Sequence, residues 1–239
     1  MKNTKTIGIT GASGALSKAL INIFKSNGYN IIGFTHNKNP QQSGNEEPNK
    51  WVYWECGQEF LLEESLKEID ILILNHGIYD SKSQPKLRNS IEINALSKLK
   101  ILELFENILL TNPNNSLKKE IWINTSEAEI LPALNPYYEI SKSLIGQSIT
   151  FKKNFLNNNE SKQLIIKKII IGPFKSELNP IGIMSPEFVA TLIYYFSKLN
   201  IYLLIISPNP ITYIIFPIQE FYYFVYYSFL KIIKKDFFN

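Results

Sequence analysis

A tyrosine and a lysine stand four residues apart in the segment Tyr138–Lys142, which reads YEISK. Residues at this spacing lie on the same face of a helix, so both side chains can reach one cleft. A phenol alone is a poor proton shuttle at neutral pH, but a fixed positive charge beside it favours the phenolate. The pair is a candidate acid–base unit. Because the same spacing is common on solvated helices, the rest of the chain has to support this interpretation.

A glycine-rich turn near the start of the chain gives the first support. Lys5–Thr10 reads as a buried strand, the sequence GASGALS follows, and a helical pattern continues through Phe24. Strand, glycine turn and helix form the context that a dinucleotide-binding fingerprint requires, with the helix N-terminus binding the diphosphate. Ser17 takes the place of the third glycine. The residues expected to contact a cofactor here are Gly11, Ser13, Gly14, Ala15 and Leu16.

Length and composition are typical of an α/β enzyme. The chain has 239 residues, of which 45% are hydrophobic, so it can bury a full core as one large domain. The net charge of +4 is modest and the basic residues are scattered, which argues against a nucleic-acid partner. A single cysteine, Cys56, excludes an internal disulfide. The first strand begins almost at Met1, which leaves no room for a signal peptide and predicts a cytoplasmic protein.

Apolar runs alternate with helical patterns along the chain, as a parallel sheet with crossover helices requires. The expected strands are Lys5–Thr10, Tyr29–Phe34, Trp51–Trp54, Ile71–Leu74, Glu120–Asn124, Leu164–Ile171 and Ile201–Ile206. Helices are expected through Phe24, over Leu87–Leu110 and Pro136–Phe155, and after Ser185, with a polar loop at 36–50. The pattern predicts an α/β fold, a single Rossmann-type doubly wound parallel sheet of about seven strands, over residues 1–206.

Residues 207–239 form a separate aromatic extension. Between residues 211 and 233 the sequence is dense in Tyr, Phe and Ile. On a helix, Phe221, Val225, Phe229 and Ile232 share one face, Glu220, Lys231 and Lys234 gather on the other, and Phe224 breaks the pattern. Pro217 and Glu220 argue against a single membrane span. Two interpretations are open: contact with a membrane surface through residues 211–235, or packing on the domain or on a partner subunit.

Several motifs together resemble the short-chain dehydrogenase/reductase family over about residues 5 to 206. They occur in that family's order: the turn Thr10–Ser17, Asn75-His76-Gly77, Glu92-Ile93-Asn94, Asn124-Thr125-Ser126, the Tyr138/Lys142 pair and Gly172–Ser176. The stretches Trp54–Gly57, Ile123–Ile130 and Leu178–Met184 are similar to a group labelled bifunctional sterol desaturase/short-chain dehydrogenase. Membrane di-iron oxygenases need clusters of histidines, whereas this chain has only His36 and His76, so no metal site is expected.

The resemblance implies hydride transfer between a nicotinamide and a carbonyl or alcohol, with four catalytic residues. Tyr138 would exchange a proton with the substrate oxygen, and Lys142 would favour the phenolate and bind the nicotinamide ribose. Ser126 would hold the substrate oxygen, and Asn94 would help to hold a water in the proton relay. Ser126 precedes Tyr138 by 12 positions where 13 is commoner in the family, so Thr125 is an alternative to Ser126.

The cofactor is expected to be NADP(H), with NAD(H) as the alternative. Folds specific for NAD place a carboxylate after the second strand, but residues 33–38 contain none. Thr35 and His36 could bind a 2′-phosphate and Lys38 could neutralise it. The resemblance adds further cofactor contacts, which are Glu55 and Cys56 near the adenine, Asn75, His76 and Gly77 along the cofactor, and Pro173, Phe174 and Ser176 at the nicotinamide.

These observations favour an NAD(P)(H)-dependent oxidoreductase that acts on a small or lipid-like substrate. A regulatory protein that binds the cofactor without turnover is one alternative, and an epimerase or dehydratase that uses the cofactor transiently is another. The resemblance also suggests a homodimer or homotetramer, since such assemblies are common among the family. Surface contact through the aromatic extension would make the protein a peripheral membrane protein.

Overall fold

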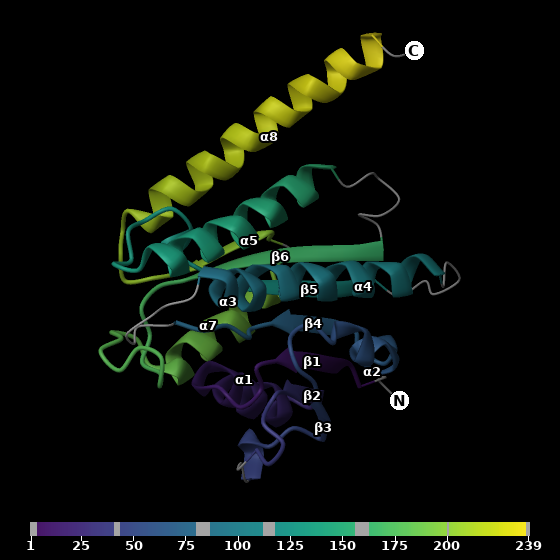
Figure 1. The fold of residues 1–239 in the computed structure, drawn as a ribbon, viewed down its shortest axis with the longest axis vertical. Coiled ribbons are helices and arrows are strands. Elements are labelled where there is room, and N and C mark those ends of the chain that lie inside the picture. Colours follow the sequence, from purple (N-terminus) through teal and green to yellow (C-terminus); the bar gives the residue numbers. More distant parts are fainter. Residues whose placement is uncertain are drawn as a thin grey trace.

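Seven parallel strands form one sheet in the order β3-β2-β1-β4-β5-β6-β7 (Figure 1). The computed structural model of the protein describes residues 4–40, 44–79, 87–111, 118–155, 163–199 and 201–237. The strands are β1 (Thr6–Thr10), β2 (Asn30–Thr35), β3 (Lys50–Tyr53), β4 (Ile71–Leu74), β5 (Lys119–Ser126), β6 (Leu164–Ile171) and β7 (Leu203–Ile206). The predicted Rossmann-type doubly wound fold is confirmed.

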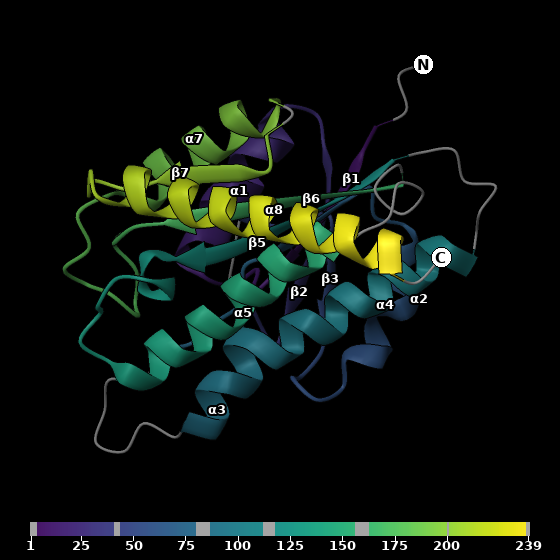
Figure 2. The ribbon, with the colours of Figure 1, turned by 90° about the horizontal axis from the view of Figure 1, so that it is seen from above.

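Helices cover both faces of this sheet, because strands such as β4 are apolar and buried on both sides. Helices α1 (Ala15–Ser26) and α7 (Pro186–Ser197) bury one apolar cluster, with Phe24 and Trp122 in contact at its centre. Helices α2 (Glu63–Lys67), α4 (Ser97–Thr111) and α5 (Pro136–Phe155) bury the other cluster. Figure 2 shows α1 and α7 on one side of the strands and α4 and α5 on the opposite side.

The strand order reverses between β1 and β4, which lie side by side although they are far apart in sequence. In open parallel sheets, ligands bind in the crevice outside the carboxyl ends of the strands at such a reversal. Thr10 and Leu74 are paired at the ends of these two strands. The fold therefore places a binding site where β1, β4 and β5 end.

Some elements differ from the sequence prediction. Strand β5 extends to Ser126, which pairs with Ile171 in β6, because pairing with β6 continues past the apolar run. The predicted helix over 87–110 is divided into α3 (Leu87–Ile91), a π-helical turn η3 (Glu92–Leu96) and α4. The short helices η1 (Gly44–Glu46), η2 (Glu59–Leu62), η4 (Glu127–Glu129) and α2 were not predicted. Residues 41–43 of the predicted polar loop lie outside the described residues.

The aromatic extension forms one helix, α8 (Thr212–Phe237), which contacts α5. In Figure 1, α8 (yellow) is the outermost element next to α5, and its far end projects from the body of the molecule. The helix continues through Pro217. None of the helices in the described parts of the chain combines the length and the apolar character that crossing a membrane would require.

The turn after β1 depends on glycine at position 11. Gly11 has a φ of 65°, a conformation that residues with a side chain rarely adopt. A Cβ atom there would also lie 2.8 Å from the backbone Cα of His76, so the turns after β1 and β4 could not approach each other as they do. The positive φ and the close approach to His76 therefore both require glycine at position 11, where the ends of β1 and β4 meet.

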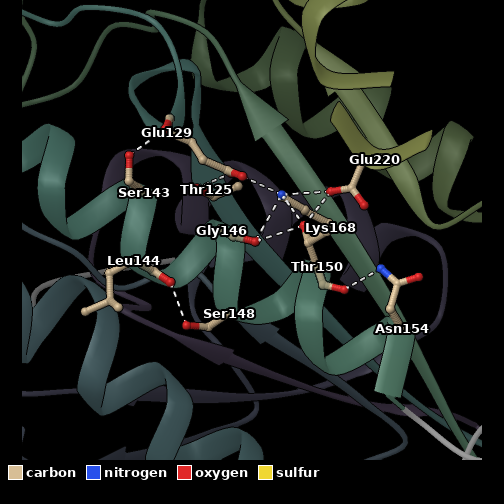
Figure 3. A network of polar contacts seen from close by, with 10 residues as sticks. All are labelled: Thr125, Glu129, Ser143, Leu144, Gly146, Ser148, Thr150, Asn154, Lys168 and Glu220. Atoms are coloured by element: carbon tan, nitrogen blue, oxygen red, sulfur yellow. Dashed lines mark hydrogen bonds and ion pairs between the residues drawn. The ribbon is translucent and has the colours of Figure 1, made fainter. Parts of the chain in front are cut away.

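A buried lysine joins four elements on the α5 side of the sheet (Figure 3). Lys168 of β6 is completely buried, and its Nζ atom lies 2.5 Å from Glu129 and 3.0 Å from Glu220. The same atom donates to the Thr150 hydroxyl at 2.9 Å and to the Gly146 carbonyl at 3.1 Å, both on α5. A buried ammonium is tolerated only when it is paired and hydrogen-bonded, so this network fixes β6, η4, α5 and α8 relative to one another.

Glu129 occupies a space that only glycine at position 146 leaves open. A Cβ atom on Gly146 would overlap the Glu129 carboxyl group. Burial raises the pKa of Glu129 to about 7, although the neighbouring Lys168 ammonium opposes that increase. Because the folded protein holds this proton more tightly than the unfolded chain, the free energy of unfolding that Glu129 contributes decreases as the pH rises from about 4.5 to about 7.

We expect Gly11→Ala to destabilise the protein more than Gly28→Ala does. Gly28 also has a positive φ, 82°, but nothing lies within 4 Å of the position of its Cβ atom. Gly28→Ala should therefore cost only the conformational term of about 1 kcal/mol, whereas Gly11→Ala adds a backbone clash and should cost at least about 2 kcal/mol. Denaturant unfolding of both variants measures the difference, and equal losses would contradict the close packing of the two turns.

Glu129→Gln should remove part of the pH dependence of stability, because glutamine does not titrate. Between pH 4.5 and 7, the difference in free energy of unfolding between wild type and Glu129→Gln should shift by on the order of 3 kcal/mol in favour of the variant. Chemical unfolding across this pH range measures it. Glu64→Gln, at a position with 84% side-chain exposure, is the matched control and should parallel the wild type. A parallel curve for Glu129→Gln would disprove the raised pKa.

Candidate active site

Polar side chains from the ends of β1, β4 and β5 are joined by hydrogen bonds at the predicted crevice. The Thr10 hydroxyl accepts the backbone N–H groups of Asn75 at 3.0 Å and His76 at 3.3 Å. The Asn75 side chain donates to Ser17 at 2.8 Å and accepts from Asn124 at 2.8 Å. Ser17 is fully buried in place of the family's third glycine, so its hydroxyl has a defined structural partner.

The first turn of α1 can bind an anion. Gly14 is the N-cap residue, and because glycine has no side chain, no side-chain hydrogen bond caps the first turn. Beside it, the hydroxyl groups of Ser13 and Thr35 lie 3.3 Å apart. Uncapped N–H groups at a helix N-terminus, next to a turn with little side-chain bulk, fit a diphosphate. The backbone of Ala15 and Leu16 belongs to this turn, while the Leu16 side chain is in the core.

His76 lines the crevice as a neutral side chain. Its Nδ1 atom lies 2.8 Å from the Thr10 hydroxyl, and its ring meets the Trp54 ring edge to face at 5.3 Å. Burial lowers its pKa well below the ordinary value, and the charges of Lys98 and Lys142 lower it further. Its buried Nε2 atom makes no hydrogen bond within the described part of the protein. Because protein encloses this nitrogen, the contact of His76 with a cofactor stays a prediction.

The predicted 2′-phosphate residues differ in their exposure. Thr35 is buried and its hydroxyl accepts the N–H of Asn37 at 3.1 Å, whereas His36 and Lys38 are exposed. The Lys38 Nζ atom lies 5.5 Å from the centre of the Tyr53 ring, at the end of β3. Lys38 therefore makes a cation–π contact with Tyr53 at the end of the neighbouring strand.

Glu55 and Cys56 follow β3 as expected. Glu55 accepts a hydrogen bond from the Tyr53 hydroxyl. Cys56 packs against the core, and burial raises the pKa of its thiol, so it is not an activated nucleophile.

Tyr138 and Lys142 lie together on α5, as the spacing predicts. The Lys142 Nζ atom is 5.2 Å from the centre of the Tyr138 ring, and Lys142 is buried although it is a cation. Tyr138 is half-buried, and its ring meets the Tyr79 ring edge to face at 5.0 Å. The Asn135 side chain accepts the Tyr138 N–H at 3.1 Å and so caps the start of the helix. The two groups are positioned from a rigid element.

Asn94 connects this pair to the turn after β4. Its side chain donates to the Ser141 hydroxyl at 2.9 Å and to the Ile78 carbonyl at 3.0 Å, and it accepts the Ile78 N–H at 2.8 Å. A Cβ atom on Gly77 would lie 2.9 Å from the Asn94 Oδ1 atom and 3.7 Å from the Lys142 Nζ atom. Asn94 lies in the π-helical turn η3, a feature that often marks functional sites.

Ser126 and Thr125 point to opposite sides of β5, because side chains alternate along a strand. Thr125 is buried and donates to Glu129 at 3.4 Å, on the side of the Lys168 network. Ser126 shares its side of β5 with Asn124, which contacts Asn75 in the crevice. Its hydroxyl accepts the Ala128 N–H at 3.2 Å and caps η4, so the hydroxyl hydrogen is not used in that bond. Among the described residues, no hydrogen bond joins Ser126 to Tyr138.

Hydrogen bonds within the loop after β6 connect its two ends. The Pro173 carbonyl accepts the Ile183 N–H at 3.0 Å, and Phe174 forms an isolated bridge with Met184. The Ser176 hydroxyl accepts the Asn179 N–H at 3.1 Å. No hydrogen bond or ring contact joins Pro173, Phe174 or Ser176 to the Tyr138 cluster in the described ranges.

Lys98 is a site residue that the motif analysis missed. It is 1% exposed, and its Nζ atom donates to the Asn124 carbonyl at 2.8 Å. Burial lowers its pKa well below the ordinary value, and the nearby Lys142 charge lowers it further. The available signal was helical spacing, because Lys98 falls on the same face as Asn94, Ile101 and Leu102. In the part of the chain that the structure describes, no three His, Cys, Asp or Glu side chains are grouped to hold a metal ion.

Comparisons with known proteins show the family to which the chain belongs. The model of the NAD dependent epimerase/dehydratase family matches residues 7–128. Monoglucosyldiacylglycerol epimerase of Synechocystis sp. is 38% identical over 228 residues, which are 93% of this chain and 54% of the relative. The chain therefore spans about half the length of that curated relative.

Solved structures confirm the fold. A short-chain dehydrogenase from Burkholderia cenocepacia in complex with NADP has a TM-score of 0.72 at 14% identity, covering 85% of this chain and 88% of that one. A short-chain dehydrogenase from Sphingobium yanoikuyae in complex with NADPH has a TM-score of 0.71 at 13% identity, covering 86% and 88%. The chain has the fold of these short-chain dehydrogenases, as predicted, and it belongs to the NAD dependent epimerase/dehydratase family.

Proposed function

We propose that this chain catalyses hydride transfer at a carbinol or carbonyl carbon, with NADP(H) preferred over NAD(H). The observation that carries the proposal is the position of Lys142 and Asn94 around Gly77, with the Tyr138 ring beside Lys142 and the glycine turn after β1 next to His76. When bound, the nicotinamide ring supplies or accepts the hydride, and the protein positions the groups that handle the proton.

Tyr138 exchanges a proton with the substrate oxygen. The Lys142 Nζ atom lies 5.2 Å from the centre of the Tyr138 ring, where its positive charge stabilises the negative charge that develops on the phenol oxygen during proton transfer. The Ser126 hydroxyl donates to the same substrate oxygen as negative charge develops. Asn94 holds the Ile78 backbone and Ser141 in place, so it positions the turn and the helix on which the reaction depends.

The preference for NADP(H) is supported by the charges around the end of β2. Residues 33–38 contain no carboxylate to bind a ribose 2′-hydroxyl, and Lys38 adds a positive charge over the end of β3. Thr35 and His36 add polar groups beside it. The carboxylate of Glu55 is hydrogen-bonded to Tyr53 and follows β3. It does not follow β2, where an NAD-specific fold would place a carboxylate.

A lipid-like substrate is supported by exposed apolar side chains in the loops that follow β5 and β6. Leu134 is 98% exposed in the loop after β5, and Ile181 and Ile183 are 90% and 72% exposed in the loop after β6. Apolar side chains exposed next to a polar site suit a substrate with a polar head and an apolar body. The name of the Synechocystis relative gives a glycosylated diacylglycerol as the molecule on which that protein acts.

Epimerisation of a sugar carbinol is the second candidate, and the name of the same relative favours it. The same side chains serve such a reaction in both directions. Tyr138 removes the hydroxyl proton when the carbinol is oxidised and returns a proton when the ketone is reduced on its opposite face. An epimerase gives no net change in NADPH, whereas a dehydrogenase consumes or produces it.

Tyr138→Phe should lower turnover by about 10²- to 10⁴-fold, because the phenylalanine ring keeps the packing but has no proton to exchange. Turnover of a panel of ketones and of monoglucosyldiacylglycerol in mixed micelles is measured by NADPH absorbance and by analysis of the head-group sugar. NADPH affinity should change less than about twofold, because the substitution removes at most one weak, uncharged hydrogen bond to the cofactor.

Tyr137→Phe is the matched control, since Tyr137 is the neighbouring half-buried tyrosine on α5. It should retain turnover. Equal activity of wild type and Tyr138→Phe would disprove the proposed role, and NADPH binding without turnover of any substrate would favour a regulatory protein.

Lys38→Gln should weaken NADPH binding about fivefold, as expected for the loss of one exposed ion pair worth about 1 kcal/mol. NADH lacks the 2′-phosphate and should bind the variant as it binds the wild type. Titration calorimetry with both nucleotides measures the two affinities. A parallel loss for NADH would show that Lys38 acts on the fold and not on the phosphate.

A further inference from the structure

Helix α8 has an inner side with specific partners. Its residues recur every three or four positions and are Thr212, Phe216, Glu220, Tyr223 and Tyr227. Thr212 donates to Glu127, and Phe216 is 1% exposed. The rings of Tyr223 and Tyr227 lie 5.2 Å and 6.1 Å from the Phe151 ring of α5. The helix thus packs on the domain through the side that carries these five residues.

Glu220 fixes the rotation of α8 about its axis. Its carboxylate accepts hydrogen bonds from Thr150 at 2.6 Å and from the buried Lys168 at 3.0 Å (Figure 3). Turning the helix to bury a different side would withdraw a carboxylate from a buried ammonium, which is strongly unfavourable. The outer side of α8 is therefore held away from the domain.

That outer side is apolar and aromatic. Ile214, Ile218 and Phe221 are 60%, 62% and 67% exposed. Further exposed residues on α8 are Tyr222, Phe224, Val225, Tyr226, Phe229, Leu230 and Ile232. An exposed surface this rich in large apolar side chains marks an interaction site.

The distribution of charge on α8 indicates the kind of partner. Among the side chains of α8 that the structure describes, Glu220 and Lys231 are the charged ones. Glu220 is directed inward to Lys168, and Lys231 lies about three turns later on the same side of the helix, so the described outer side carries no charged side chain. An uncharged surface of phenyl rings, phenols and aliphatic side chains, with a cation on the adjoining side, matches the boundary between the acyl chains and the head groups of a bilayer.

We propose that the outer side of α8 binds the interface of a membrane. The helix lies along the membrane plane, with the domain on its inner side. Thr212, at the start of α8, is bound to Glu127, the residue after Ser126. The membrane surface therefore begins at the edge of the sheet where the candidate active site lies. This surface depends on the α8 side chains and not on the proposed chemistry.

Flotation of the full chain with vesicles of equal parts phosphatidylcholine and phosphatidylglycerol tests the proposal. The wild type should float with these vesicles. The variant Ile218→Ser/Phe221→Ser/Val225→Ser should need at least about a tenfold higher lipid concentration, because three exposed apolar contacts are removed. The variant Phe60→Ser/Leu61→Ser/Leu110→Ser removes apolar side chains that are 67%, 52% and 57% exposed elsewhere, and it should float as the wild type does.

Two outcomes would overturn the proposal. Equal flotation of wild type and the α8 variant would show that this surface does not bind lipid. Absence of flotation together with a dimer that the α8 variant dissociates, measured by sedimentation, would show that a second copy covers the surface. Far-UV circular dichroism of the same samples confirms folding, and their NADPH binding is measured separately. Flotation of a protein that binds no NADPH would refute the proposed function and leave the membrane surface intact.

Discussion

The pairing of one buried ammonium, that of Lys168, is the constraint on which the arrangement of the protein depends. Its partners are Glu129 after β5, Thr150 and Gly146 on α5, and Glu220 on α8. An unpaired charge in this position would be far too costly, so these elements are held in one relative placement. That placement fixes the helix that carries Tyr138 and Lys142 against the strand that ends at Ser126. It also decides which side of α8 faces outward.

Much of the fold could be predicted because the chain's local signals agree with one another. Apolar runs the length of strands, separated by helical patterns, gave all seven strands, and Gly11 marked the turn at the reversal point. The ends of elements were less predictable, since they depend on partners. Ser126 ends β5 through pairing with β6, and the π-helical turn at Asn94 depends on contacts with Ile78 and Ser141. Helix α2 is five residues long and has no periodicity to detect.

The candidate site was predictable where a motif fixes the geometry, and less so elsewhere. The i, i+4 spacing was enough to bring Tyr138 and Lys142 together. The alternation along β5 places Ser126 on the side of Asn124 and Thr125 on the side of Glu129, and which of the two holds the substrate oxygen stays a prediction. Lys98 and Lys168 look like ordinary solvated lysines in the sequence, because burial depends on tertiary contacts. For α8, the two interpretations of the sequence describe its two sides: one packs on the domain, and the other is exposed.

Gly146 has an evolutionary consequence. The carboxyl group of Glu129 fills the volume that any side chain at position 146 would need, and that carboxyl group binds Lys168. A lineage that acquires alanine at 146 must displace the acid, and the lysine then loses a counter-ion. Positions 129, 146 and 168 should therefore change together in evolution. A homologue should carry either glutamate, glycine and lysine at these positions or apolar residues in place of the charged pair.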